Sequence, residues 1–435
     1  VNTSQTNGHT LIDGCNPVIG ALIQLPKRRI VVSFQVIADV SPIACPEPLD
    51  AVLHIPCECL VRLDSVIDSL RSCYLNVCYL CHWLAPLYVC SLPLPFRVVL
   101  YFPIHCFARA IGAVGATFYV IGVGLLYSVT GTLNIADLTE RLTPIADNNA
   151  VRAGISFIII GLMVKAAIFP LHVWLPAAYS YAPTAVTVLL TATATKAALY
   201  ILARVLFTLL FNTDEFTNIV LNWVLLPAAM IAIFFGTIRA IFENDIKRLL
   251  AFSSLSQIGY TVVGLCLGTK VGIIAAFIHL ANHALIKSAL FMGVGSISAV
   301  MKSKVDYKLL KGIGYTMPIT AVCITIATLS LLGIPLTAGF ISKFFLIKSI
   351  LLSQNWFVVI MVLLTSFLAL GYTWKIIEYM WMYKPENSQW MNEKPLILIP
   401  LIILVILNLF FGVYAYPIIE GANIASDSIS WSNNG

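Results

Sequence analysis

The sequence predicts an all-α protein that crosses a membrane several times. Of its 435 residues, 59% are hydrophobic and only 11% are charged, whereas a soluble domain carries about 25% charged residues. Apolar runs recur from about residue 107 to 417, and many reach the roughly 20 residues that a helix needs to span a bilayer. The alternating segments of about ten residues that mark a membrane β-barrel are absent.

The expected helices follow in chain order, with boundaries uncertain by several residues. They run over 107–129, 151–171, 185–211, 217–240, 248–267, 271–300, 312–333, 336–352, 355–382 and 395–416. Gly333-Ile334-Pro335 joins the pair 312–333 and 336–352, and proline removes a backbone donor. The pair therefore forms either two spans or one broken helix, whose irregular backbone must be covered by protein or by a water-filled cavity.

The loops favour one broken helix. If 312–352 is a single crossing, alternate loops share a side of the membrane. One set, formed by 241–249, 301–311 and 383–394, contains Lys247, Arg248, Lys302, Lys304, Lys308, Lys311, Lys384 and Lys394. The other set includes 212–216 and the end of the chain after 417, with Asp214, Glu215, Glu420 and Asp427. Basic loops face the cytoplasm, so we expect the first set there.

The two ends differ from the transmembrane domain expected over 101–417. Residues 1–100 form an atypical region that prolines punctuate, in which only 73–92 is long enough to insert, and no clean signal peptide opens the chain. Residues 418–435 are expected as a polar C-terminal tail.

Cysteines are concentrated near the start of the chain, where nine of the 11 lie at or before Cys106. Cys78 to His82 spells C-x-x-C-H, the pattern of covalent haem attachment. That pattern normally belongs to a soluble, exported domain, but here it lies within an apolar run. We therefore expect neither haem nor zinc, and no cofactor of any kind.

Basic side chains interrupt the apolar helices without acidic residues nearby in sequence. No Asp or Glu occurs between Asp147 and Asp214, between Asp245 and Asp306, or between Asp306 and Glu378. Those windows contain Lys165, Lys196, His279, His283, Lys287, Lys343 and Lys348. A lysine at the bilayer centre costs roughly 2.5–3.5 kcal/mol and usually marks an ion pathway. Burial lowers the pKa of a lysine, so such groups can pass protons, helped by Thr191, Thr193, Thr195, Thr337 and Ser342.

Each basic residue also has a structural interpretation. A lysine near a helix end extends to the membrane interface, which we favour for Lys348 and Lys375, while Lys165 and Lys287 stay open. His279 and His283 share one helical face and could bind a metal, but no third ligand is evident and we expect none. The net charge of +6 comes without a basic or aromatic stripe, so we expect no nucleic acid.

Two segments resemble each other. "APTAVTVLLTATATK" and "GIPLTAGFISK" both run from a proline through small and hydroxyl residues to a lysine, Lys196 and Lys343. Paired, proline-interrupted apolar segments in two halves of a transporter indicate inverted repeats around a site at mid-membrane.

Five stretches resemble the antiporter-like subunits shared by multisubunit cation/proton antiporters (their D-type subunits), respiratory complex I and membrane-bound hydrogenases. They are "LLYSVTGTLNI" (125–135), "KAAIFPLHVWLPAAYSYAPTAVTVLLTATATKAALYILAR" (165–204), "NDIKRLLAFSSLSQIGY" (244–260), "HLANHALIKSALF" (279–291) and "LSLLGIPLTAGFISKFFL" (329–346). The resemblance implies two inverted five-helix repeats with broken helices. It also implies a hydrophilic axis of charged residues along the membrane midplane.

The resemblance assigns expected roles to six residues. Lys165 matches the lysine of the first half-channel beside the first broken helix, and Lys196 matches the bridging lysine that follows. The connecting elements of the second half match His279, His283 and Lys287. The terminal lysine or glutamate of the second broken helix matches Lys343.

The family also places a membrane glutamate two helices before the Lys165 position. That region of this chain offers only Glu47 and Glu58, and residues 1–95 do not match the first helices of the family. Without that acid, Lys165 would lack its charge partner.

We therefore expect a subunit that passes protons, or exchanges them for sodium, through Lys165, Lys196, His283 and Lys343. It would work with other membrane subunits in a bacterial plasma membrane and carry no redox centre of its own. "AYSYAPTAVTVLLTATATK" most resembles the D-type antiporter subunit. Two alternatives stay open, namely a proton-pumping membrane subunit of NADH-quinone oxidoreductase or a related hydrogenase, and a degenerate structural copy that does not transport.

Overall fold

The computed structural model describes residues 97–209, 214–385 and 390–429 of the chain. The described residues from Pro103 onward belong to one compact unit. Almost all of the predicted region 1–100 lies outside the described residues. The same is true of the segment 73–92, the C-x-x-C-H pattern, Glu47 and Glu58.

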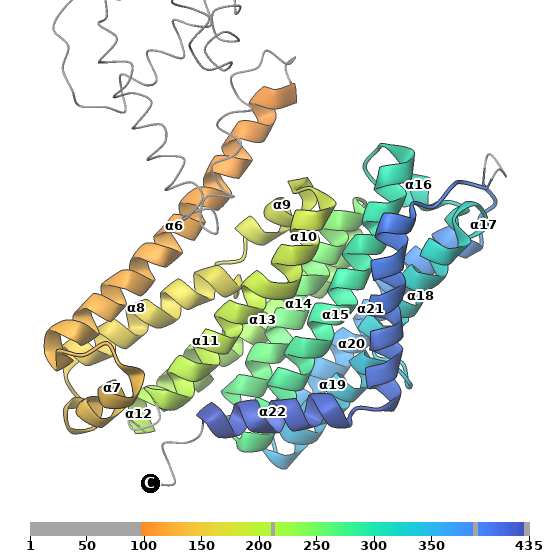
Figure 1. Ribbon diagram of the computed structural model, residues 1–435. Helices are drawn as coiled ribbons and strands as arrows, with labels where there is room; N and C mark the ends of the chain where they lie inside the picture. Colours follow the sequence, from red (N-terminus) through yellow and green to blue (C-terminus); the bar gives the residue numbers. More distant parts are fainter. Residues whose placement is uncertain (1–96, 210–213, 386–389, 430–435) are drawn as a thin grey trace, which may run out of the picture. The chain divides into compact units, whose positions relative to one another are not determined.

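The described residues are helical, and they contain no strand (Figure 1). The first half comprises α6 (Arg97–Thr130), α7 (Ile135–Leu142), α8 (Asn149–Ala166), α9 (Trp174–Tyr181), α10 (Thr184–Leu189), α11 (Thr195–Thr208), α12 (Asp214–Asn218) and α13 (Leu226–Phe242). The second comprises α14 (Ile246–Cys266), α15 (Lys270–Met301), α16 (Tyr307–Leu310), α17 (Ile313–Thr316), α18 (Pro318–Leu332), α19 (Ala338–Leu352), α20 (Trp356–Trp381), α21 (Pro395–Val413) and α22 (Tyr416–Ile429). Within these ranges, eight uninterrupted helical stretches are long and apolar enough to cross a membrane.

The expected spans agree with these helices to within a few residues, apart from three ends. The helix expected from residue 107 begins at Arg97. The span expected to reach residue 171 ends at Ala166, because Ala167 turns left-handed at φ 56° and Pro170 follows. The span expected from residue 312 begins at Pro318. Proline is well suited to the first turn of a helix, where its missing N–H would have no partner.

Small residues let the helices of the first half approach closely. A Cβ at Gly122 of α6 would lie 2.5 Å from the carbonyl oxygen of Gly154 on α8. The same packing joins α13 to α14, where a Cβ at Gly236 would lie 2.8 Å from the carbonyl oxygen of Phe252. Such contacts bring backbones together where hydrocarbon surrounds the protein and burial of apolar surface gives little drive to association.

Helices α18 and α19 are two parts of one broken crossing, which confirms the interpretation favoured by the loops. Both pack along α15, one after the other. Ser296 of α15 bonds Thr320 of α18, and further along α15 Asn282 donates to the carbonyl of Ala338 at the start of α19. The chain therefore continues in one direction past Gly333 rather than folding back.

The predicted basic loops meet at one end of the helices. Asp245 and Asp306 form a bridge, and Ile246 N donates to Val305 O at 3.0 Å. The backbone of Gly312 bonds that of Tyr379, close to the third loop. Their shared side is thus confirmed, and its assignment to the cytoplasm stays a prediction.

Most of the region expected as a polar tail, 418–435, belongs to a helix, α22. It is helical as far as Ile429, and α22 runs across the long helices rather than along them (Figure 1). Ala422, Ser426 and Ile429 are buried, and their spacing of four and three residues puts them on one face. Lys270 at the start of α15 pairs with Asp427 at 2.5 Å.

Candidate functional site

The first break in the helices separates α8 from α9. The Ala167 amide donates to the carbonyls of Met163 and Val164, which ends α8. The Val164 carbonyl also accepts a hydrogen bond from the indole Nε1 of Trp174, at 2.9 Å. His172 is buried in the linker, stacked on Phe169 with ring centroids 5.1 Å apart. The break therefore satisfies its carbonyls with neutral donors.

Lys165 lies in the last turn of α8, and its side chain is exposed. None of the ion pairs among the described residues includes it. The structure thus places the residue that sequence favoured as the centre of the first half on an open face of the helix.

Lys196 occupies a buried position immediately after a π-helical turn, Leu190–Ala194, that joins α10 to α11. Its ammonium donates to the carbonyl of Thr191, within that turn. The hydroxyls of Thr191 and Thr195 lie close to that of Tyr179, whereas Thr193 faces outward. Two of the three predicted hydroxyl residues therefore border Lys196.

Helix α15 carries three basic side chains on one face, at intervals of four residues. The rings of His279 and His283 are parallel within 4° and their centroids are 6.1 Å apart. Lys287 is fully buried and donates to the carbonyl of Leu250 at 2.9 Å and to the hydroxyl of Ser253. No group of three His, Cys, Asp or Glu side chains in the described ranges could hold a metal ion.

The second break lies at one end of this row of side chains. His279 Nδ1 is 3.1 Å from the hydroxyl of Ser342 on α19, next to Lys343. Lys343 is buried and donates to the carbonyl of Leu332, at the end of α18, at 2.9 Å. Its ammonium also lies 5.6 Å from the centre of the Tyr260 ring.

Five of the six predicted site residues therefore meet inside the protein. Lys196 lies within electrostatic range of both histidines and of Lys287, and Lys343 lies within range of His279. This buried basic row consists of Lys196, Lys287, His283, His279 and Lys343. The structure does not bring Lys165 into it.

The row has no carboxylate beside it in the part of the chain that the structure describes, where no Asp or Glu is buried. The acids there lie in loops and at helix ends, such as Asp137, which accepts a hydrogen bond from Arg141 at 2.8 Å. That guanidinium holds the pKa of the Asp137 carboxyl below its ordinary value. Among the described residues, the ammonium groups of the row are therefore hydrogen-bonded to carbonyls and a hydroxyl rather than paired with carboxylates.

Sequence reasoning missed two neighbours of the row. Asn282 is fully buried between the two histidines and holds the start of α19 through the Ala338 carbonyl, at 2.8 Å. Tyr260 lies against Lys343 and bonds Thr365 on α20 at 2.9 Å. An amide between two histidines of an apolar helix was a visible signal, because buried polar groups need partners. Nothing in the sequence placed Tyr260 beside Lys343.

The two lysines assigned to the interface behave differently from the row. Lys348 is exposed, with its ammonium 6.0 Å from the centre of the Phe345 ring. Lys375 is half-buried against Tyr307 of α16, at 4.1 Å. Each side chain lies along an aromatic ring, as expected for amphipathic side chains.

Known sequences and structures resemble this chain over most of the described helices. The family described as "NADH:quinone oxidoreductase/Mrp antiporter, TM" matches residues 107–369. The N subunit of the NADH-quinone oxidoreductase of Desulforudis audaxviator is 39% identical over 275 residues, which cover 62% of this chain and 53% of that protein. The D subunit of the Na(+)/H(+) antiporter of Alkalihalophilus pseudofirmus is 33% identical over 314 residues, 72% of this chain and 62% of that protein. The chain thus spans less than two thirds of the length of these relatives.

Solved structures share the fold. A chain of the membrane-bound sulfane sulfur reductase, an archaeal respiratory membrane complex, superposes with a TM-score of 0.70 at 31% identity, over 75% of this chain and 67% of that one. A chain of the Mrp complex from Dietzia sp. gives a TM-score of 0.68 at 25% identity, over 76% and 69%. Both come from multisubunit membrane complexes. The family match covers more than half of the sequence, and this chain is an integral, multi-pass membrane protein of the NADH:quinone oxidoreductase/Mrp antiporter family.

Proposed function

We propose that this chain is a proton-translocating component of a multisubunit membrane complex, similar to the D-type subunits of cation/proton antiporters. The buried basic row is the single observation that carries the proposal. Ionisable groups inside a membrane are costly and mark ion pathways, and a row kept only for stability would be better built from leucine.

The geometry supports a stepwise passage of protons. Lys196 and Lys343 each donate to a backbone carbonyl, the first beside the π-helical turn and the second at the break after α18. On α15, His283 Nε2 and Asn282 Oδ1 have no hydrogen-bond partner among the described residues. The imidazole nitrogen can accept a proton and the amide oxygen can accept a hydrogen bond from water, so this part of the row suits relay better than fixed pairing.

In this proposal Lys165 is the group through which protons reach the buried row. It is exposed at the end of α8, and α8 packs against α11, the helix that carries Lys196. An exposed ammonium at that position can exchange protons with its surroundings and deliver them toward Lys196.

The proposal is tested in everted vesicles that carry this chain with its partner subunits, using a dye that reports the pH difference across the membrane. Lys287→Met should abolish proton movement, because Lys287 is the most deeply buried ammonium of the row. Lys308→Met, an exposed loop lysine, serves as the control and should leave transport intact. Equal transport in both variants, at equal amounts of assembled protein, would rule out the buried row as the path.

Sodium exchange and membership of an NADH-quinone oxidoreductase are separable in the same vesicles. A sodium gradient that drives proton movement indicates the antiporter. Proton movement that depends on added NADH indicates the oxidoreductase. The relatives carry both names at similar identity, so this experiment chooses between two forms of one transport role.

A structural, non-transporting copy is the second candidate. The exposed Lys165 and the lack of a buried acid in the described ranges favour it. It predicts that wild-type vesicles show no proton movement through this chain, although the complex assembles. The chain can also be deleted from the complex. This alternative is supported if the complex then fails to assemble while the remaining subunits still move protons.

A further inference from the structure

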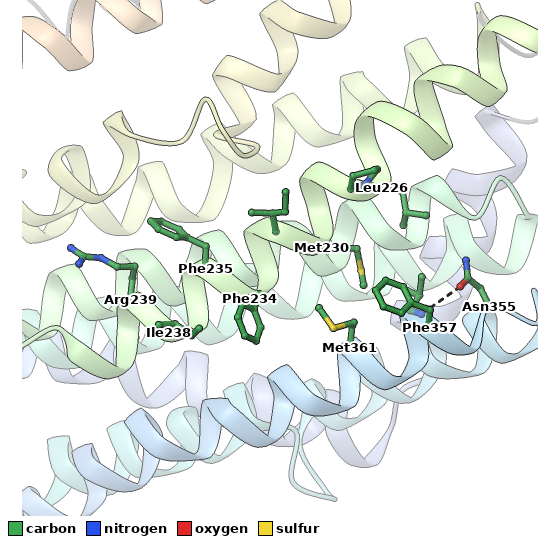
Figure 2. A pocket seen from close by; sticks show the side chains of 12 residues that line it. Leu226, Met230, Phe234, Phe235, Ile238, Arg239, Asn355, Phe357 and Met361 are labelled. Atoms are coloured by element: carbon green, nitrogen blue, oxygen red, sulfur yellow. Dashed lines mark hydrogen bonds between the residues drawn. The ribbon is translucent and has the colours of Figure 1, made fainter.

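An apolar groove runs along the outer side of α13 and the beginning of α20. Its volume is about 630 Å³, within the range of pockets that hold small ligands. Figure 2 shows Arg239 at one end of the lining, with Asn355 and Phe357 at the other. Between them the lining is aliphatic, aromatic and thioether, including Met230 and Met361.

The groove is separate from the buried basic row and opens on the outer surface of the membrane-spanning helices α13 and α20. Ile231, Phe234 and Phe357 line it and are 48%, 37% and 68% exposed. None of the five row residues lines it. An apolar groove open to the bilayer is accessible to lipid from the membrane itself.

Arg239 gives the groove one charged end. Its guanidinium carbon lies 5.3 Å from the centre of the Phe252 ring, an arrangement that leaves the N–H groups at the guanidinium edge available to an anion. Glu243, four residues later, pairs with Arg248 at 3.5 Å. Arg239 belongs to none of the ion pairs in the described ranges.

The charged end lies at the level of lipid headgroups. The membrane-spanning stretch that contains α13 ends at Phe242, three residues beyond Arg239. The side is that of the basic loops, since Asp245 and Lys247 follow directly. Basic pockets between membrane helices on that side are typical sites for anionic lipid headgroups.

We propose that this groove binds an anionic phospholipid, with the phosphate on Arg239 and one acyl chain between α13 and α20. From Leu226 to Arg239 the helix advances about 20 Å at 1.5 Å per residue, which exceeds the roughly 15 Å depth of one leaflet. One acyl chain therefore fits lengthwise. The proposal does not depend on proton translocation.

The test is native mass spectrometry of the full chain released from detergent, with phosphatidylglycerol or phosphatidylcholine added. Wild-type protein should retain phosphatidylglycerol preferentially. Arg239→Gln should reduce that preference about tenfold, as expected for loss of one charged hydrogen bond. Lys348→Gln removes another exposed cation that lies over a phenylalanine ring and should keep the wild-type preference.

A second pair of variants tests the groove without touching the charge. Ile231→Trp should fill the lining and reduce retention of both lipids, whereas Ile360→Trp should not. Ile231 lies on α13, whereas Ile360 lies on α20, is 61% exposed and does not line the groove. Both replace an exposed isoleucine, so each should fold as the wild type does.

Three outcomes of the lipid-retention measurements would overturn the proposal. They are a phosphatidylglycerol preference that survives Arg239→Gln, lipid retention that is equal in Ile231→Trp and Ile360→Trp, and no lipid retained by the wild type. Inorganic phosphate, added alone, distinguishes a headgroup site from a general anion site. Phosphate that competes fully with phosphatidylglycerol while Ile231→Trp has no effect would also contradict the lipid assignment.

Discussion

The two breaks in the membrane helices have the same backbone solution and different chemical surroundings. Each follows a residue in the left-handed region, Ala167 at φ 56° and Gly333 at φ 91°, whose amide donates to two carbonyls of the preceding turn. At the first break the indole of Trp174 donates to the carbonyl of Val164, which also accepts from the Ala167 amide. At the second, the ammonium of Lys343 donates to the carbonyl of Leu332.

The difference teaches that a broken helix does not by itself make an ionisable site. Lys165, two residues before the first break, is exposed, whereas Lys343 is 8% exposed at the second. The second break is covered by α15, α20 and α21. The cover brings His279 and Tyr260 to Lys343, so the neighbouring helices decide whether a lysine joins the basic row.

The largest effect on proton movement is expected when the lysine at the second break is removed. Lys343→Met should reduce proton movement at least about 100-fold, because a positioned proton-transfer group is typically worth 10²–10⁴. The measurement is the pH-dye response of everted vesicles. Lys348→Met, five residues later and exposed on the same helix, should keep wild-type rates. A similar decline in both variants would mean that the whole helix, and not the buried ammonium, matters.

Close packing at the second break should be the next most sensitive feature. A Cβ at Gly339 would lie 1.8 Å from the carbonyl oxygen of Ser330, so Gly339→Ala must push α19 away from α18. We expect a loss of about 3 kcal/mol in unfolding free energy, measured by denaturant titration in detergent. Gly124→Ala, where a Cβ meets nothing within 4 Å, is the control. Unchanged stability of Gly339→Ala would show that the two helices separate more freely than this packing implies.

Exchanging glycine and alanine at the two left-handed positions should change the unfolding free energy in opposite directions. Gly333→Ala should cost about 1–2 kcal/mol, because a Cβ is strained at positive φ. Ala167→Gly should gain up to about 1 kcal/mol, since the relief of strain exceeds the extra chain entropy that glycine loses. Thermal unfolding of the two purified variants measures both. A destabilised Ala167→Gly would indicate that the methyl group, which is fully buried, contributes more by packing than it costs in strain.

The smallest effect is expected from the neutral donor at the first break. Trp174→Phe removes one hydrogen bond to Val164 and should cost about 0.5–1.5 kcal/mol, with proton movement preserved. Trp356→Phe, at a 65% exposed position, should change stability less. Transport that falls with Trp174→Phe as far as with Lys343→Met would make the two breaks functionally equivalent and remove the contrast drawn above.

Sequence could predict much of the fold because its signals are local. Apolar length gave the spans, and Gly333-Ile334-Pro335 gave the second break, since proline and glycine act on their own backbone. The spacing of His279, His283 and Lys287 placed them on one helical face before any packing was known. The side shared by the basic loops followed from counting crossings, which needs no tertiary contact.

The site was predictable only in part, because its completion depends on residues far apart in the chain. Asn282 acts through Ala338 and Tyr260 through Lys343 and Thr365, and no spacing rule joins those pairs. The helix after Tyr416 was missed for a related reason. Few residues of this helix are buried and most of those are small, and they are buried only because the helix contacts α15 and α11.

The sequence by itself determined that this chain is a multi-pass membrane protein with basic groups in apolar helices, and it favoured a break at Gly333-Ile334-Pro335. Hydrophobicity and backbone chemistry act locally, so they can be read residue by residue. Only the tertiary structure decided which lysines are buried together. Lys165 and Lys343 both stand in apolar stretches, and among the described residues what separates them is whether other helices lie over the ammonium.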